Sequence, residues 1–279
     1  MNRKDEIHRI MSLSPEEVIE KAGDTLIVCE TLDDLYHQFA KDIFTEIQAR
    51  NERKTITRLI LPIGPTKQYP ILAKMINEEQ LPLKSCTFFF MDEYADDDEK
   101  ALSEDHPLSF KGIANSLFLN KIDENLLPAP SRIHFPDENN IESLAGLIKS
   151  RGIDTCYGGI GIHGHIAFNE PGLGVVHSNP HLVNLNNFTI TINAIRAGVG
   201  GNLEGFPKFA YTIGMRQIFT ARKIRLYCRN GTSFDWANTV LRLALFGRPG
   251  DDYPVTHIRD RDYVIITDED TLKTPENIL

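Results

Sequence analysis

Two kinds of segment alternate along the chain: short runs of consecutive apolar residues, and longer stretches in which apolar residues recur every three or four positions. The runs are typical of buried strands and the stretches of amphipathic helices. The run at 25–29 is followed by Thr31, a residue type that often caps helices, and then by such a stretch. Its apolar positions are Leu32, Leu35, Tyr36, Phe39, Ile43, Phe44 and Ile47. The pattern here predicts a strand and then a helix.

The same alternation continues to the C-terminus. Further strands are predicted at 56–61, 86–91, 153–157, 209–213, 223–228 and 263–267. Further helices are predicted at 14–22, from about 66, and at 107–119, 138–150 and 232–246. Strands that alternate with helices favour an α/β fold, here a single doubly wound, mainly parallel sheet of Rossmann-like type with helices on both faces. Residues 1–23 are assigned to an N-terminal helical extension and residues 24–279 to one domain.

Composition narrows the class of protein. The chain has 279 residues, of which 41% are hydrophobic, as in folded globular proteins. Its 30 Lys and Arg against 39 Asp and Glu give a net charge of −9, which argues against a nucleic-acid partner. No run approaches the roughly 18 apolar residues of a membrane span, and the N-terminal segment lacks the apolar core of a signal peptide. Neither a nucleic acid nor a membrane is expected as a partner.

All four cysteines lie inside apolar, strand-like runs, at Cys29, Cys86, Cys156 and Cys228. Buried thiols of a reducing compartment account for this placement better than disulfides, because a free cysteine packs as a small apolar residue. We therefore expect a cytoplasmic protein.

Polar segments follow three of the predicted strands, at 64–66, 92–94 and 158–171. The carboxyl ends of parallel strands meet at one edge of the sheet, where ligands bind in folds of this kind. The third segment holds four glycines together with His163, His165 and Glu170. Histidine transfers protons near neutral pH, and a carboxylate can orient it. A glycine-rich turn with solvated histidines is the alternative, and it accounts less well for so many polar groups after a buried strand.

Asp92 and Glu93 directly follow the apolar run at 86–91. A carboxyl group at a strand end, partly shielded by a neighbour such as Phe90, should have a raised pKa and could act as a base. The alternative is a pair of solvated charges at the start of the acidic loop 96–105.

Four strings carry a resemblance to a known family: LPIGPT at 61–66, FFFMDEYAD at 88–96, HPLSF at 106–110 and GGIGIHGHIAFNEP at 158–171. Together they resemble the glucosamine-6-phosphate deaminase/isomerase family, from about residue 24 to about residue 270. The resemblance implies aldose–ketose isomerisation through an enediol-type intermediate, with loss of the C2 amine as ammonia to give fructose 6-phosphate. It also implies a small sugar or sugar phosphate as partner, no metal or organic cofactor, and a possible homo-oligomer.

The resemblance also assigns roles to residues. Asp92 looks like the base that carries a proton between C1 and C2 of the open-chain sugar. His165 looks like the residue that assists ring opening, with Glu170 as the carboxylate that supports it. His163 is included among the catalytic candidates because it stands two residues before this histidine, where the family has an aspartate.

Substrate binding is assigned by the same resemblance. Gly64 and Thr66 match the phosphate-binding loop, and Arg196 matches a substrate-binding arginine. Glu93, next to the expected base, is taken as a further substrate-binding residue.

The chain departs from the family pattern at three places. His163 stands where the family has an aspartate, two residues before the ring-opening histidine. Ile63 and Pro65 replace a small polar residue and a glycine in the phosphate loop, which removes a hydroxyl and a backbone donor. The segment 229–235 lacks the family's phosphate-binding lysine, for which Lys67 or Arg229 could substitute.

These departures leave three alternatives to the family reaction. The first is a diverged isomerase that acts on a different, possibly unphosphorylated, sugar derivative. The second is a non-catalytic sugar-binding sensor on the same fold. The third is a metal site, because the His-Gly-His spacing can chelate a transition metal with Glu170 or Asp92 as a third ligand. The family resemblance argues against the third, so no metal is expected.

Overall fold

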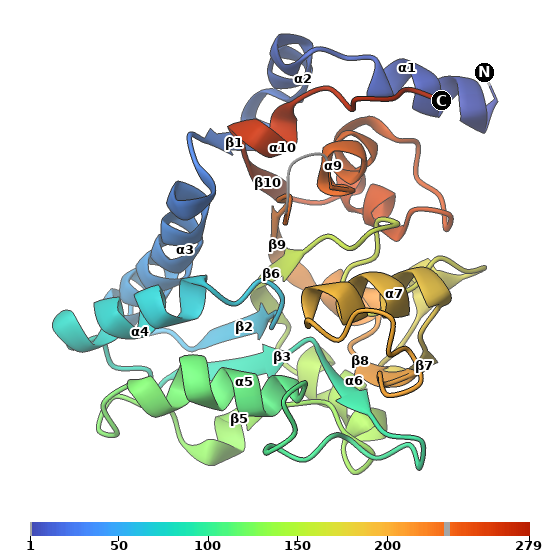
Figure 1. Cartoon of the computed structure of the whole chain (residues 1–279). Helices are drawn as coiled ribbons and strands as arrows, with labels where there is room; N and C mark the ends of the chain where they lie inside the picture. The colour runs from blue at the N-terminus through green and yellow to red at the C-terminus, as the bar shows by residue number, and fades with distance from the viewer. Residues whose placement is uncertain (1, 232–234) are drawn as a thin grey trace.

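A parallel sheet forms the centre of the molecule (Figure 1), in a computed structural model that describes residues 2–231 and 235–279. Its seven strands are ordered β1-β10-β9-β6-β2-β3-β5, and each neighbouring pair is parallel. The strands are β1 (Leu26–Cys29), β10 (Tyr263–Asp268), β9 (Ala221–Tyr227), β6 (Ile153–Gly159), β2 (Thr57–Leu61), β3 (Cys86–Phe90) and β5 (Ile133–His134). The predicted α/β architecture is confirmed.

The order of the strands creates a crevice beside β2. From β2 the chain proceeds to β3 and β5 at one edge, and then β6 returns to the opposite side of β2. Connections that leave β2 and β6 therefore diverge, and in open α/β sheets ligands bind at such a point. The loops after these two strands come close together: a Cβ on Gly159 would lie 2.9 Å from the carbonyl oxygen of Gly64.

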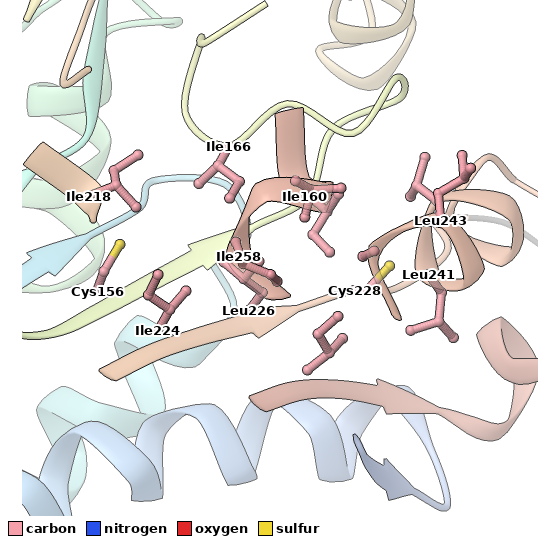
Figure 2. Close-up of a cluster of buried hydrophobic side chains, with 14 of the residues drawn as sticks. Cys156, Ile160, Ile166, Ile218, Ile224, Leu226, Cys228, Leu241, Leu243 and Ile258 are labelled. Atoms are coloured by element: carbon pink, nitrogen blue, oxygen red, sulfur yellow. The ribbon is translucent and has the colours of Figure 1, made fainter. Parts of the chain in front are cut away.

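Helices cover both faces of the sheet. Successive residues of a strand point to opposite faces, so the apolar side chains of one strand contact helices on both sides. Leu59 and Leu61 pack in one core with α3 (Leu32–Glu52), α4 (Gln68–Glu78) and α5 (Phe110–Leu117). The intervening Ile60 packs in the other core with α6 (Ile141–Lys149), α8 (Met215–Ile218) and α9 (Ala237–Phe246). Figure 2 shows part of this second core, in which Ile224 and Leu226 of β9 lie with Leu241 of α9.

The N-terminal segment joins the second core. It forms α1 (Arg3–Met11) and α2 (Pro15–Ala22), which bury Ile10, Met11 and Val18 there. Arg242 of α9 is fully buried, and its Nη2 donates to the carbonyl oxygens of Leu13 and Leu272, at 3.1 and 3.0 Å. Leu272 ends α10 (Glu269–Leu272), so this arginine links both ends of the chain to α9.

A second, antiparallel sheet has the order β4-β8-β7. Its strands are β4 (Asp92–Ala95), β8 (Phe209–Thr212) and β7 (His181–Asn184). The prediction of 209–213 as a strand is correct, but its assignment to the main sheet is wrong. The chain leaves the main sheet at Met91, and β4 then pairs with β8, with Asp92 opposite Thr212. A short apolar run indicates a buried strand without indicating its partner.

The remaining predicted helices differ from the structure in their bounds. The helix expected at 107–119 is α5 followed by a 3₁₀ turn, and the helix expected at 232–246 is α9, with 232–234 outside the described residues. The helix α7 (Asn187–Arg196) was not expected from the sequence, and neither were the strands β4, β5 and β7 or the short helices α8 and α10. The 3₁₀ turns are η1 (Gly23–Thr25), η2 (Leu119–Lys121), η3 (Pro130–Arg132), η4 (Val175–His177) and η5 (Pro254–Asp260).

Two expectations from composition can be compared with the structure. All four cysteines are free thiols, three of them buried and Cys29 half-buried. Of the helices within 2–231 and 235–279, none is long and apolar enough to cross a membrane.

Candidate active site

A cavity of about 620 Å³ lies at the carboxyl ends of β2, β6 and β9. The loops after these strands and the first residue of β4 line it, so the three polar segments predicted to meet at one edge do meet there. Five of the candidate residues line the cavity: Gly64, Thr66, Asp92, His165 and Arg196. The other three candidates, Glu93, His163 and Glu170, lie outside its lining.

Asp92 is placed in the cavity by the break between the two sheets. It is the first residue of β4 and only 7% exposed. Within the described chain its carboxylate accepts no hydrogen bond, so nothing compensates the loss of water around the charged form. Burial, and after it the charge of Glu93, raises the pKa of Asp92 to about 8. The carboxyl group can therefore exchange a proton close to neutral pH.

Glu93 points away from the cavity, as expected for the next residue of a strand. Its carboxylate accepts hydrogen bonds from Ser109 Oγ at 3.1 Å and from the backbone N–H groups of Phe110 and Lys111 at 2.9 and 2.7 Å. These donors belong to the start of α5, so Glu93 holds that helix end against β4. Burial raises the pKa of Glu93 even though these hydrogen bonds act to lower it.

His165 is held over the glycine loop that follows β6. A Cβ on Gly161 would overlap the Nε2 end of the imidazole ring, so only glycine allows this close approach. On its other side, Nδ1 of His165 lies 3.2 Å from Nδ1 of His163. Burial, followed by the nearby His163, lowers the pKa of His165 to about 3, which leaves this imidazole neutral at neutral pH.

Glu170 contacts His163 rather than His165. Its Oε2 lies 3.4 Å from Nε2 of His163. Burial acts to raise the pKa of Glu170, but hydrogen bonds from His163 and Thr189 hold it below its ordinary value. Its Oε1 is buried and has no hydrogen-bond partner among the described residues. Among the described residues, the carboxylate contacts the imidazole of His163, which in turn contacts the cavity histidine, while its charge also acts on His165.

Two residues that the sequence did not single out, Asn186 and Thr189, complete this cluster. Asn186 Nδ2 and Thr189 Oγ1 lie 2.7 and 3.2 Å from Nε2 of His163. Asn186 could have been recognised as a helix cap, since its Oδ1 accepts from the backbone N–H of Thr189, but nothing local indicates its contact with a residue 23 positions away. His106, from the HPLSF string, lines the cavity as well.

Positive charge gathers at one side of the cavity. Arg196 lies over the ring of Trp236, with 3.6 Å between the guanidinium carbon and the ring centre, and its Nη2 is 2.8 Å from Asp235 Oδ2. Burial, and also the nearby charge of Arg229, lowers the pKa of Arg196. Arg229 lines the cavity too, and its buried Nε has no partner within residues 2–231 and 235–279. Two guanidinium groups and the Gly64–Thr66 turn together favour an anionic group.

Comparison with known sequences places this geometry in context. A glucosamine-6-phosphate deaminase of Caenorhabditis elegans is 33% identical over 210 residues, which cover 72% of this chain and 74% of that protein. A glucosamine-6-phosphate deaminase of Clostridium perfringens is 29% identical over 256 residues, 89% of this chain and 98% of that protein. None of the models of known protein families matches the chain.

Solved structures give the same picture of the fold. A monomeric glucosamine-6-phosphate deaminase of the NagB superfamily aligns with a TM-score of 0.76 and 27% identity, over 88% of this chain and 98% of that one. A 6-phosphogluconolactonase from Thermotoga maritima aligns with a TM-score of 0.64 and 18% identity, over 88% of this chain and 99% of that one. At 18% identity the second likeness shows the fold alone.

Proposed function

Because the chain belongs to the glucosamine-6-phosphate deaminase family, we propose that it is an enzyme that isomerises and deaminates an amino-sugar phosphate, with glucosamine 6-phosphate as substrate. The observation that carries this proposal is the cavity that Asp92 and His165 share. A buried carboxyl group with a raised pKa and a neutral imidazole are the proton-transferring groups that such a reaction needs.

In this scheme His165 opens the pyranose ring by moving the proton of the C1 hydroxyl to the ring oxygen. The aldehyde at C1 makes the proton on C2 more acidic, and the ionised carboxylate of Asp92 removes it. Return of the proton to C1 leaves an imine at C2, which water converts to a ketone with release of ammonia. One amino aldose and one water thus give one ketose and one ammonia.

The phosphate group is assigned to the side of the cavity where Arg196 and Arg229 lie. Arg229 Nε is a buried donor without a partner in the described chain, and a phosphate oxygen would satisfy it. The Gly64–Thr66 turn leads into α4, whose N-terminal end adds favourable dipoles for an anion. In this arrangement Arg229 takes the place of the lysine that the family has in the segment 229–235.

A diverged isomerase for an unphosphorylated sugar is the second candidate. It is favoured by Ile63 and Pro65, which line the turn in place of groups that could donate to a phosphate. The two candidates differ in one measurable property, the dependence of turnover on the 6-phosphate.

The test measures ammonia and fructose 6-phosphate formed from glucosamine 6-phosphate, with glucosamine as the unphosphorylated comparison and a chelator in all assays. The wild-type protein is expected to form both products in equal amounts from the phosphorylated sugar. Asp92→Asn should lose at least a hundredfold in kcat, since a general base typically contributes about 10²–10⁴-fold. Asp97→Asn, an exposed acidic residue of the neighbouring loop, is the matched control and should retain full activity.

Each other result has a definite meaning. Full turnover by Asp92→Asn would refute the assignment of this carboxyl group as the base. Equal turnover of glucosamine would favour the second candidate. His163→Asp, which restores the family residue, is assayed alongside. If this variant turns over glucosamine 6-phosphate and the wild type does not, the histidine at position 163 is the reason that the wild type lacks the family activity.

A further inference from the structure

Two imidazole nitrogens face each other beside the cavity. The Nδ1 atoms of His163 and His165 are 3.2 Å apart. Two nitrogen ligands at about 2.0–2.1 Å from a tetrahedral Zn²⁺ ion would be separated by roughly 3.3 Å. The pair in this protein therefore already has the separation of two ligands of one metal ion.

A third ligand group is available next to them. One ligand atom from each of His163, His165 and Glu170 can be chosen so that all three lie within 4.8 Å of one another. The Oε1 atom of Glu170 is buried and accepts no hydrogen bond from any described residue. A buried carboxylate oxygen without a partner is costly unless a cation or donor satisfies it.

We propose that His163, His165 and Glu170 bind one divalent transition-metal ion of the Zn²⁺ class. Imidazole nitrogens favour zinc and its neighbours in the periodic table, whereas Ca²⁺ and Mg²⁺ require oxygen ligands. The chelating pair exists because this chain has a histidine at 163, where the family pattern has an aspartate. The metal would share His165 with the proposed sugar chemistry, but its binding can be measured in the absence of any sugar.

The groups near Nε2 of His163 indicate that its Nδ1 is the atom that binds the metal. With the metal on Nδ1, the proton of His163 is on Nε2, where Thr189 Oγ1 at 3.2 Å can accept it while Glu170 ligates the metal. Such outer partners orient metal-bound histidines. The Asn186 amide fits less well, because its Oδ1 caps α7 and its Nδ2, a donor, lies 2.7 Å from Nε2. A carboxylate at 186 could cap the helix with one oxygen and accept from Nε2–H with the other.

The experiment uses the full-length protein after treatment with a chelator and measures Zn²⁺ binding by calorimetry and by metal content after dialysis. One Zn²⁺ per chain is expected for the wild type. His163→Asp should weaken the affinity at least tenfold. Asn186→Asp should strengthen it by about tenfold, the lower end of the range for outer partners of metal ligands. His177→Asn removes an exposed histidine of η4 and is expected to leave the affinity unchanged.

Circular dichroism and melting temperature establish that each variant is folded. The proposal is overturned if the wild type binds no stoichiometric Zn²⁺, or if folded His163→Asp binds it as tightly as the wild type. A loss of binding in His177→Asn would overturn it too, because the metal would then lie elsewhere. An unchanged affinity in Asn186→Asp would overturn the assignment of Nδ1 as the ligating atom of His163.

Discussion

Asp92 and Glu93 are neighbours in the chain, yet their carboxyl groups have different surroundings. Asp92 faces the cavity without a hydrogen bond from any described residue, whereas Glu93 accepts several from the start of α5. The acidic pair could be recognised from the sequence as a candidate site, and so could His165 in its glycine loop. The different surroundings of the two carboxyl groups could not be predicted, because they depend on how β4 is oriented against β8, a strand more than 100 residues away.

The raised pKa of Asp92 leads to a prediction about pH. Asp92 acts as a base only when ionised, and its pKa is about 8 in the free protein. We therefore expect kcat/KM to rise about tenfold per pH unit below this value and to level off above it. Initial rates measured from pH 6 to 9.5, with chelator present and enzyme stability checked at each pH, test this. A profile that is flat over the range, as for an ordinary aspartate, would contradict the prediction.

At the scale of the element, the main sheet and its helices could be predicted because their apolar residues follow clear periods. The helix α7 could not be, since its sequence NFTITINAIR is rich in β-branched residues that favour strands. Its N-cap, Asn186, is the one local signal of a helix. This helix supplies Thr189 to the histidine cluster, a residue that the sequence did not reveal, and Arg196 to the cavity, a residue that the family resemblance had indicated.

The contact between Glu93 and α5 yields a prediction about stability. Glu93→Ala leaves Ser109 Oγ and the N–H groups of Phe110 and Lys111 without their acceptor. A loss of about 2–4 kcal/mol in the free energy of unfolding is expected, since each unsatisfied buried donor costs about 1–3 kcal/mol and local relaxation recovers part of it. Urea denaturation of the variant and the wild type measures it.

The same variant tests the assignment of Glu93 from the family resemblance. If Glu93 binds substrate directly, the variant should retain its stability and show a raised KM. If Glu93 holds α5, the free energy of unfolding of Glu93→Ala should fall. Ser109→Ala removes one of the donors and the N-cap of the helix, so its free energy of unfolding should fall as well, by about 1 kcal/mol.

At the scale of the whole molecule, the buried guanidinium of Arg242 joins segments from both ends of the chain. It donates to the carbonyl oxygens of Leu13, Asn238, Leu272 and Lys273. No local pattern predicts this, because an arginine on a helix is usually exposed and three of the four partners are distant in sequence. The sequence indicated the N-terminal helices but not what they pack against.

Arg242→Met is predicted to destabilise the protein by about 3 kcal/mol. Methionine can fill much of the space, but the four carbonyl groups then lose their donor in a buried place. Thermal and urea denaturation should show a single transition at lower temperature and lower denaturant concentration. An unchanged midpoint would mean that water replaces the guanidinium, and that this arginine contributes little to joining the two ends.

The position of β10 has a consequence for how the protein is made. This strand, at residues 263–268, lies between β1 at the edge and β9 in the interior of the sheet. On the ribosome, β1 is synthesised more than 200 residues before β10, the strand with which it pairs in the described part of the chain. During synthesis β1 therefore remains without this partner until the later residues have been made, and the pairing of β1 with β10 is expected to form late in folding.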